Sequence, residues 1–343
     1  MSTVRGPLTA PTRPTSAAEA ALELARGGAR PRAGGTDLAA CVESGVVAPG
    51  PLVDLARAED LRETRWTEDG GVRIGAMTTV AALGTRPRLA EAYPGLAAAA
   101  RALATPQVRS VATVGGNLLQ RNRCPYLRNP AFDCFQTGGE GCPARTGDHL
   151  RGVVVDLGPC AAPHPSSLAV ALLAHEATVV VVTGGGSSQE GGQAERDLAA
   201  LYDGTDPTRD HRLAPDELLT AVVLPAPVPG ERAAHLRAAG RARAEWPLVE
   251  AVVRLECAKE GAGPVARAWV AVGGVARTPL RLSGVERALV GAVPGREPGP
   301  GFDRALEGVA DLCSPLPSTG YKVDLLRASV RDAVERALGA PAR

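Results

Sequence analysis

Apolar residues recur at helical spacing near both ends of the chain. At the carboxyl end they stand three or four positions apart, which predicts one long helix that stops at Gly339: Val323, Leu326, Val330, Val334 and Leu338. At the amino end, Ser16 and Glu19 form a capping-box pattern before an alanine-rich run, which predicts a helix over residues 17–26. We therefore expect a helix near each end.

Short apolar and β-branched runs predict strands between these helices. They cover residues 29–33, 52–55, 72–75, 108–114 and 177–183. Two later runs, 249–257 and 266–272, look like a pair of strands, and the alanine-rich stretch 95–104 predicts a helix that ends before Pro106. This mixture of elements predicts an α+β chain.

Two glycine pairs follow predicted strands. The first is GGT at residues 34–36, and the second is GGN at residues 115–117. Glycine pairs let backbone N–H groups approach a bound phosphate closely, and two such loops about eighty residues apart favour a dinucleotide. The first loop alone is also compatible with an ordinary tight turn capped by Thr36 or Asp37. Neither loop matches the Rossmann fingerprint.

Four cysteines follow the second glycine pair. Cys124, Cys134, Cys142 and Cys160 are separated by nine, seven and seventeen residues, in a stretch rich in Gly, Pro, Asn and Asp. The spacing fits neither paired zinc knuckles nor a ferredoxin run. From the residues alone, an iron-sulfur cluster, a structural zinc ion and scattered reduced thiols all stay open. The other three cysteines stand in apolar segments and are expected in cores: Cys41, Cys257 and Cys313.

Composition excludes several classes of function. The chain has 343 residues, enough for two or three domains, and 38 basic residues balance 37 acidic ones, so no basic surface for nucleic acid or anionic lipid is expected. The first residues lack the apolar region of an export signal, and the longest apolar run is too short for a membrane span. We expect a soluble, cytoplasmic chain, exported only if a partner subunit carries it.

Three motifs resemble one known family. AGGTDL at residues 33–38, ATVGGNLLQ at residues 112–120 and VGGVARTPLR at residues 272–281 are similar to the FAD-binding (medium) subunits of molybdenum hydroxylases, the xanthine dehydrogenase and aldehyde oxidoreductase family. QRNRCPY at residues 120–126 resembles the branch of bacterial periplasmic aldehyde oxidoreductases. In that branch, the flavin subunit carries an additional 4Fe-4S cluster on an inserted loop.

The resemblance implies an architecture. Two α+β subdomains of the vanillyl-alcohol-oxidase type, also known as the PCMH type, would hold an extended FAD within residues 1–225. The iron-sulfur loop would be inserted at about 118–163, and residues 226–343 would form a C-terminal sheet-and-helix domain like that of carbon monoxide dehydrogenase flavoproteins. A Pro-rich stretch near residues 224–230 fits this boundary.

The resemblance also implies site residues. The first loop would wrap the FAD pyrophosphate with Ala33, Gly34, Gly35, Thr36, Asp37 and Leu38. The second loop would add Ala112, Thr113, Gly116 and Asn117, and further contacts would come from Ser166, Leu218, Leu219 and Arg237. Arg237 stands where many members have lysine, and Ser167 stands where the family usually has aspartate. The resemblance assigns Cys124, Cys134, Cys142 and Cys160 to the 4Fe-4S cluster.

The implied function is electron transfer. The chain shows no nucleophile-base pair and no molybdenum-site signature, so chemistry on the organic substrate is expected in another subunit. A molybdopterin-containing large subunit would oxidise an aldehyde, a xanthine or another N-heterocycle, and a 2Fe-2S small subunit would pass the electrons to this FAD and on to an external acceptor. The alternatives are a stand-alone FAD and 4Fe-4S flavoenzyme that acts directly on a small molecule, and a scaffold that has lost FAD and keeps only a structural metal.

Overall fold

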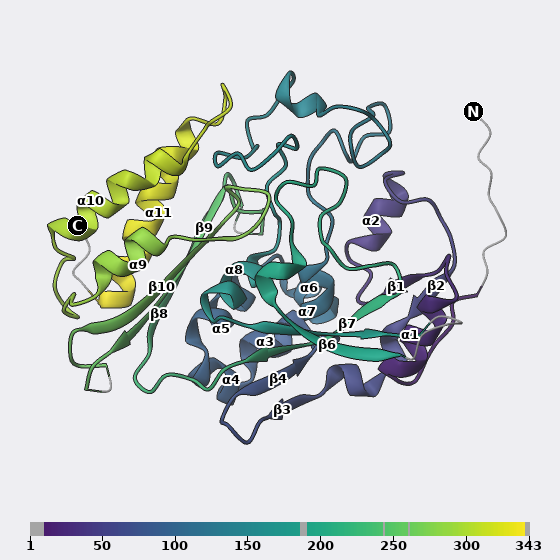
Figure 1. Cartoon of the computed structure of the whole chain (residues 1–343), viewed down its shortest axis with the longest axis horizontal. Coiled ribbons are helices and arrows are strands. Elements are labelled where there is room, and N and C mark those ends of the chain that lie inside the picture. The colour runs from purple at the N-terminus through teal and green to yellow at the C-terminus, as the bar shows by residue number, and fades with distance from the viewer. Residues whose placement is uncertain (1–9, 186–190, 243, 260, 340–343) are drawn as a thin grey trace.

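The computed structural model describes residues 10–185, 191–242, 244–259 and 261–339. Within these residues the strands form three sheets, of two, five and four strands. Figure 1 shows the four-stranded sheet and its helices at one end of the molecule and helix α1 near the other. Because the two larger sheets are antiparallel and their helices are segregated, the predicted α+β class is confirmed.

The amino-terminal unit is a two-stranded parallel sheet with helices α1 (Ala17–Ala25) and α2 (Leu38–Glu43). Strand β1 (Arg30–Arg32) pairs with β2 (Leu52–Asp54). The hydroxyl of Ser16 accepts a hydrogen bond from the N–H of Glu19, so the predicted capped start of α1 is confirmed. Buried side chains of α1 and β2 share a small core with the five-stranded sheet.

The five-stranded sheet has the order β3-β4-β7-β5-β6. Its strands are β3 (Thr64–Trp66), β4 (Val72–Gly75), β5 (Thr178–Thr183), β6 (Gly192–Asp197) and β7 (Glu217–Leu224). Neighbouring side chains of β7 enter different cores: Leu218 packs with the amino-terminal unit, whereas Leu219 packs with the helices between the sheets. This strand is therefore covered on both faces.

The carboxyl-terminal unit is a four-stranded sheet backed by helices. Its strands are β8 (Arg232–Ala238), β9 (Val249–Cys257), β10 (Val265–Gly273) and β11 (Leu280–Arg281). Its helices are α9 (Ser283–Leu289), α10 (Pro300–Glu307) and α11 (Tyr321–Leu338). The predicted β9 and β10 pairing is confirmed, as is the last helix, which ends where Gly339 adopts a φ of 67°.

Short helices fill the space between the two larger sheets. They are α3 (Val80–Thr85), α4 (Pro87–Ala92), α5 (Pro94–Ala102) and α8 (Ser167–Ala174). Helices α5 and α8 pack on each other and on β8, β9 or β10, and their apolar side chains join those of the five-stranded sheet in one core. Alanines on α5 allow this close approach, because Ala97, Ala99 and Ala100 are buried and short.

The strand predicted over residues 108–114 is wrong. The chain there forms helix α6 (Pro106–Val111) and then helix α7 (Val114–Leu118). Thr105 and Thr113 cap these helices by accepting hydrogen bonds from Val108 and Gly116, and Pro106 suits a first helical turn. These local caps outweigh the β preference of the valines. The second glycine pair therefore lies inside a short helix instead of in a turn after a strand.

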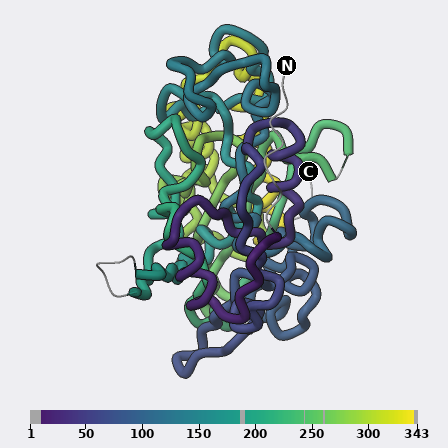
Figure 2. The backbone as a smooth tube through the Cα atoms, turned by 90° about the vertical axis from the view of Figure 1, so that its right-hand side faces the viewer, coloured from purple at the N-terminus to yellow at the C-terminus, as the bar shows by residue number. Residues whose placement is uncertain are grey.

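The segment that carries the four cysteines, residues 119–166, is held by turns. All of it is described, and its one regular element is a 3₁₀ turn at Pro143–Arg145. Figures 1 and 2 both show this segment in teal at the upper end of the molecule. The buried Lys322 fastens it to the carboxyl-terminal unit, because its ammonium donates to the carbonyls of Arg151, Gly152 and Gly274 at 2.8–3.2 Å.

In the part of the chain that the structure describes, no helix has both the length and the apolar character needed to cross a membrane.

Truncating Leu172 on α8 should test the shared core. Leu172 is 1% exposed, so Leu172→Ala should lower the free energy of unfolding by about 2–5 kcal/mol, through lost burial and the cavity left behind. Chemical denaturation of both proteins measures this difference. Leu22→Ala on α1 is the control, because Leu22 is 50% exposed and should change stability by less than about 0.5 kcal/mol. Equal effects would contradict the packing described.

Candidate functional site

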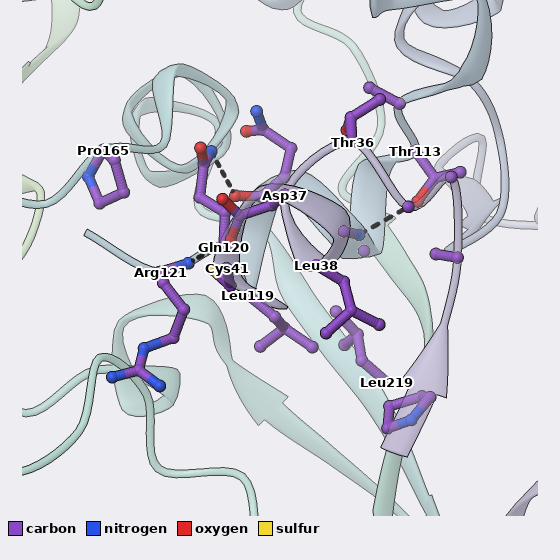
Figure 3. Close-up of a pocket in the computed structure, with 18 of the residues that line it drawn as sticks. Thr36, Asp37, Leu38, Cys41, Thr113, Leu119, Gln120, Arg121, Pro165 and Leu219 are labelled. Carbon is purple, nitrogen blue, oxygen red and sulfur yellow. Dashed lines mark hydrogen bonds between the residues drawn. The ribbon is translucent and has the colours of Figure 1, made fainter. Parts of the chain in front are cut away.

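A cavity of about 660 Å³ opens where the two glycine loops, strand β7 and the connection between β8 and β9 meet. Figure 3 shows Asp37 of the first loop, Thr113 of the second and Leu219 of β7 around it. This volume lies in the range typical of small-molecule and cofactor sites. Of the predicted site residues, thirteen line it: Ala33, Gly34, Gly35, Thr36, Asp37, Leu38, Ala112, Thr113, Gly116, Asn117, Leu218, Leu219 and Arg237. Segments far apart in sequence therefore converge on one space.

The two glycine loops touch each other directly. A Cβ atom added at Gly34 would stand 2.0 Å from the carbonyl oxygen of Val111, so only glycine fits at this contact. Gly35 has a φ of 74°, a left-handed conformation that glycine adopts at little cost. The second loop is held by the Thr113 cap and by an antiparallel bridge between Thr79 and Thr113. The backbone geometry of both loops is thus fixed by local features, the Gly35 conformation and the Thr113 cap, together with contacts between segments distant in sequence.

The side chain of Asp37 joins the first loop to the segment after the second. Its carboxylate accepts from the guanidinium groups of Arg123 and Arg128, and from the backbone N–H of Arg121 at 2.8 Å. Burial by itself would raise the pKa of Asp37, but Arg123 and these hydrogen bonds outweigh it and lower the pKa. Asp37 is therefore ionised, and its hydrogen bonds join the first glycine loop to the segment that follows the second loop.

The two predicted leucines reach the cavity at an irregularity of the sheet. The pairing of β5 with β7 shifts between Val180 and Val181, so that Thr220 has no partner in the register. A bulge of this kind bends a strand and re-aims its side chains, often next to a functional site. Leu218 and Leu219 directly precede this bulge, and both line the cavity although they enter different cores.

Arg237 lines the cavity from β8, and its guanidinium is engaged by the protein. It donates to the carbonyl oxygens of Ala102 at 2.7 Å and Glu245 at 2.5 Å, and it lies 3.8 Å from the carboxylate of Glu250. The same carboxylate oxygen lies 2.6 Å from Nε2 of His235. Arg237 thereby connects the carboxyl-terminal sheet to helix α5.

Ser166 is placed behind the cavity wall. Its hydroxyl donates to the side-chain oxygen of Asn117 at 2.7 Å and accepts from the N–H of Ala169, which caps helix α8. The neighbouring Ser167 lines the cavity instead. Ser166 therefore acts on the cavity through Asn117, whose orientation it fixes.

Several lining residues escaped the sequence analysis. They are Gln120, Arg121, Arg123, His211 and Trp246. The first three directly follow the second glycine loop, and their position in sequence could have identified them. Trp246 comes from the connection between β8 and β9, and the guanidinium of Arg123 lies 4.5 Å from its ring centre. Tertiary packing brings Trp246 and His211 here from separate segments.

The four cysteines line a second, small cavity. Cys124, Cys134, Cys142 and Cys160 all face it, together with residues that include Asn122 and Gln136. All four are free thiols. Three of them begin tight turns, in which their carbonyl oxygens accept from N–H groups three to five residues ahead: Cys124, Cys134 and Cys142. The turns thus gather the thiols although the spacing is irregular.

Hydrogen-bond donors surround these thiols. A hydrogen bond from the thiol of Cys160, together with N–H groups of residues 144, 145 and 161, lowers the pKa of Cys142. The hydrogen bond with Cys142 and, to a smaller extent, burial raise the pKa of Cys160. Burial raises the pKa of Cys124 despite the N–H groups of residues 126 and 127. The cavity therefore offers thiols with N–H groups aimed at sulfur.

The four described thiols do not surround a position that a single metal ion could occupy. Among the described residues, no group of three or more His, Cys, Asp or Glu side chains is arranged so that it could hold one metal ion. The four thiols therefore share a cavity without converging on a point.

Comparison with known families identifies the chain. Residues 8–227 match the family described as "FAD binding domain in molybdopterin dehydrogenase", and residues 234–337 match the "CO dehydrogenase flavoprotein C-terminal domain". The chain belongs to the FAD-binding subunits of the molybdopterin dehydrogenases. It is thus an FAD-binding subunit of the oxidoreductase class, and the predicted family is confirmed at this level.

Individual relatives agree with the family. The aldehyde oxidoreductase FAD-binding subunit PaoB of Escherichia coli is 35% identical over 79% of this chain and 83% of its own. The carbon monoxide dehydrogenase medium chain of Afipia carboxidovorans is 29% identical over 95% of each chain. The nicotinate dehydrogenase FAD-subunit of Eubacterium barkeri is 24% identical over 76% of this chain and 71% of its own.

Solved structures share the fold along nearly the whole chain. A chain of the cyanide-inactivated Cu,Mo-CO dehydrogenase superposes with a TM-score of 0.72 at 25% identity, covering 96% of this chain and 97% of the other. A chain of quinoline 2-oxidoreductase from Pseudomonas putida 86 superposes with a TM-score of 0.71 at 21% identity, covering 98% and 99%. The predicted fold, an FAD-binding part followed by a carbon monoxide dehydrogenase-type C-terminal part, is confirmed.

Replacing Gly34 by alanine should weaken FAD binding by about tenfold or more. The new Cβ would displace the first loop from Val111, at a cost of about 1–3 kcal/mol, and each 1.4 kcal/mol lost from binding is tenfold in Kd. Fluorescence titration of the deflavinated chain measures the Kd. Gly284→Ala on α9 is the control, since a Cβ there meets no atom within 4 Å. Unchanged affinity in Gly34→Ala would show that the loop contact does not shape the site.

Proposed function

We propose that this chain is the electron-transfer subunit of a molybdenum hydroxylase-type dehydrogenase, with FAD in the large cavity and a 4Fe-4S cluster held by the four cysteines. The observation that carries the proposal is the pairing of two cavities. One cavity is lined by both glycine loops of a chain that belongs to an FAD-binding family. The other is lined by four thiols on the segment that follows the second loop. FAD supplies an exchange of one or two electrons when bound.

The proposed FAD contacts follow the cavity wall. The backbone of residues 33–38 and 112–117 would hold the pyrophosphate, because N–H groups at close-packed glycine loops favour phosphate. Leu218 and Leu219 would lie along the flavin, and Arg237 would stand near its polar edge. Residues 1–225 would bind FAD, the inserted segment 118–163 would bind the cluster, and residues 226–343 would close the cavity from the other side.

The cluster assignment rests on the donor set. A 4Fe-4S cubane takes one thiolate at each of four iron corners, so its ligands surround a volume and need not converge as those of a single ion do. Four thiols around one cavity, approached by backbone N–H groups, suit such a group. Hydrogen bonds to cluster sulfurs also tune its reduction potential. Zinc would require a tighter tetrahedron than the described thiols form.

The proposed partners are a molybdopterin-containing large subunit and a 2Fe-2S small subunit. Relatives bear the names medium chain or FAD-binding subunit, which supports an assembly of several chains. The names of relatives also support the substrate class of aldehydes and N-heterocycles. In this account, electrons arrive from the 2Fe-2S partner and leave to an external acceptor, while the organic substrate is oxidised in the large subunit.

Replacing Cys134 by serine should remove the iron and keep the flavin. The anaerobically purified wild-type chain should contain about four iron atoms and one FAD, and Cys134→Ser should lose the broad iron-sulfur absorption while it retains flavin bands. Cys313→Ser is the control, because Cys313 packs near the core of the carboxyl-terminal unit and donates to a backbone carbonyl. Zinc without iron in the wild-type protein would overturn the cluster assignment.

Affinity purification of the tagged chain from its native cells should recover a large and a small partner subunit. Aldehyde- or heterocycle-dependent reduction of a dye should accompany the complex and not the isolated chain, because the chemistry on the organic substrate lies in the large subunit. Turnover by the isolated chain would instead favour a stand-alone flavoenzyme. A colourless, folded chain would indicate a scaffold without FAD.

A further inference from the structure

The two cavities are neighbours along the chain. Gln120 and Arg121 line the large cavity, and Asn122 and Cys124 line the cavity of the four thiols. A five-residue segment thus passes from one wall to the other. Anything that fixes this segment sets the position of one site relative to the other.

One buried carboxylate holds this segment. Asp210 lies in the connection between the 3₁₀ helix Leu198–Leu201 and strand β7. Its side chain is 4% exposed. Its oxygens accept from Nε of Arg121 at 2.9 Å, from the backbone N–H of Asn122 at 3.2 Å and from the amide of Asn122 at 2.9 Å. Both walls are therefore bonded to the same anion.

Two further donors extend the contact. The amide of Gln136, a residue of the thiol cavity, donates to Asp210 at 3.0 Å, and Arg277 of the carboxyl-terminal unit donates to it at 3.2 Å. The amide oxygen of Gln136 in turn accepts from Arg121 at 2.7 Å and from Asn122 at 3.1 Å. The group closes a ring of hydrogen bonds that ties three parts of the molecule together.

The charges in this ring are enclosed by protein. The side chain of Arg277 is 3% exposed and that of Arg121 is 27% exposed. Burial alone would raise the pKa of Asp210, but Arg121, Asn122, Gln136 and Arg277 lower it to about 2, so the carboxylate is ionised at neutral pH. A charge buried this deeply acts on nearby groups with little screening by water.

We propose that Asp210 is a positioning residue that couples the FAD site to the cluster site, mechanically through Arg121, Asn122 and Gln136 and electrostatically through its buried charge. The inference rests on the proposed function, because it assigns a role between the two proposed cofactors. Neither cavity includes Asp210 in its wall, so its effect passes through the residues it binds.

Asp210→Asn tests the coupling by redox potentiometry of the FAD- and iron-loaded chain. Reduction adds negative charge, so loss of the buried anion should raise the midpoint potentials of both flavin and cluster. Asp210→Glu, which keeps the charge, should restore them toward the wild-type values. Asp206→Asn is the matched control: Asp206 lies in the same segment, but among the described residues its carboxylate bonds to Thr208 and Arg209 and not to either cavity wall. It should leave both potentials unchanged.

A second variant keeps the test decisive if Asp210→Asn does not fold. Gln136→Leu retains the charges and cuts the bond from the thiol wall to Arg121 and Asp210. It should shift the flavin potential, although Gln136 does not line the flavin cavity.

The possible outcomes distinguish a failure of the proposed function from a failure of the proposed coupling. Wild-type protein without FAD or iron would refute the proposed function. Wild-type protein with FAD, whose potentials are unchanged in Asp210→Asn or equally changed in Asp206→Asn, would overturn the coupling. The coupling requires that the flavin and cluster potentials both shift in Asp210→Asn, so a shift of only one of them would also overturn it.

Discussion

Two carboxylates, Asp37 and Asp210, hold the cysteine-bearing segment, residues 119–166, against the rest of the chain, and a third, Asp156, forms an ion pair within the segment. Asp37 binds Arg123 and Arg128, Asp156 binds Arg145, and Asp210 binds Arg121 and Arg277. This segment forms no regular strand. Charge-assisted hydrogen bonds attach it together with Val154 and Val155, which are buried in the carboxyl-terminal core and bond through their backbone N–H groups to Val275. Removing one partner of a buried pair leaves an uncompensated charge, which is why such a loop keeps one arrangement.

The attachment gives both sites their geometry. Arg145 also donates to the carbonyls of Gly158 and Pro159, immediately before Cys160, and so shapes the turn that carries this thiol. Asp37 belongs to the first glycine loop, and Asp210 reaches both cavity walls. The large cavity itself relies on apolar packing, because α5 and α8 pack between the two larger sheets behind it. Rigid sheets thus support one site, and polar contacts support the other.

Local signals in the sequence predict several of the helices and strands. The capping box at Ser16, the helical spacing that ends at Gly339 and the β9 and β10 pair all appear as predicted. Residues 108–114 form helices instead of the predicted strand because the Thr105 and Thr113 caps outweigh the β preference of the valines. Both predicted glycine loops line one cavity, although the second lies in a helix.

Other features depend on packing and could not be predicted from sequence alone. Trp246 and His211 reach the cavity from distant segments, and Ser166 turns toward Asn117 because it caps α8. The thiols gather because turns start at three of them, which irregular spacing does not reveal. Sequence motifs identify candidate site residues, whereas the tertiary structure sets the distances between them.

The most direct test is a crystal structure of the anaerobically purified, coloured chain, with anomalous diffraction at the iron edge. Our account predicts four iron atoms in the cavity of Cys124, Cys134, Cys142 and Cys160, and FAD between the loops at residues 33–38 and 112–117. A single metal ion or no metal among these cysteines, or FAD bound elsewhere, would contradict it.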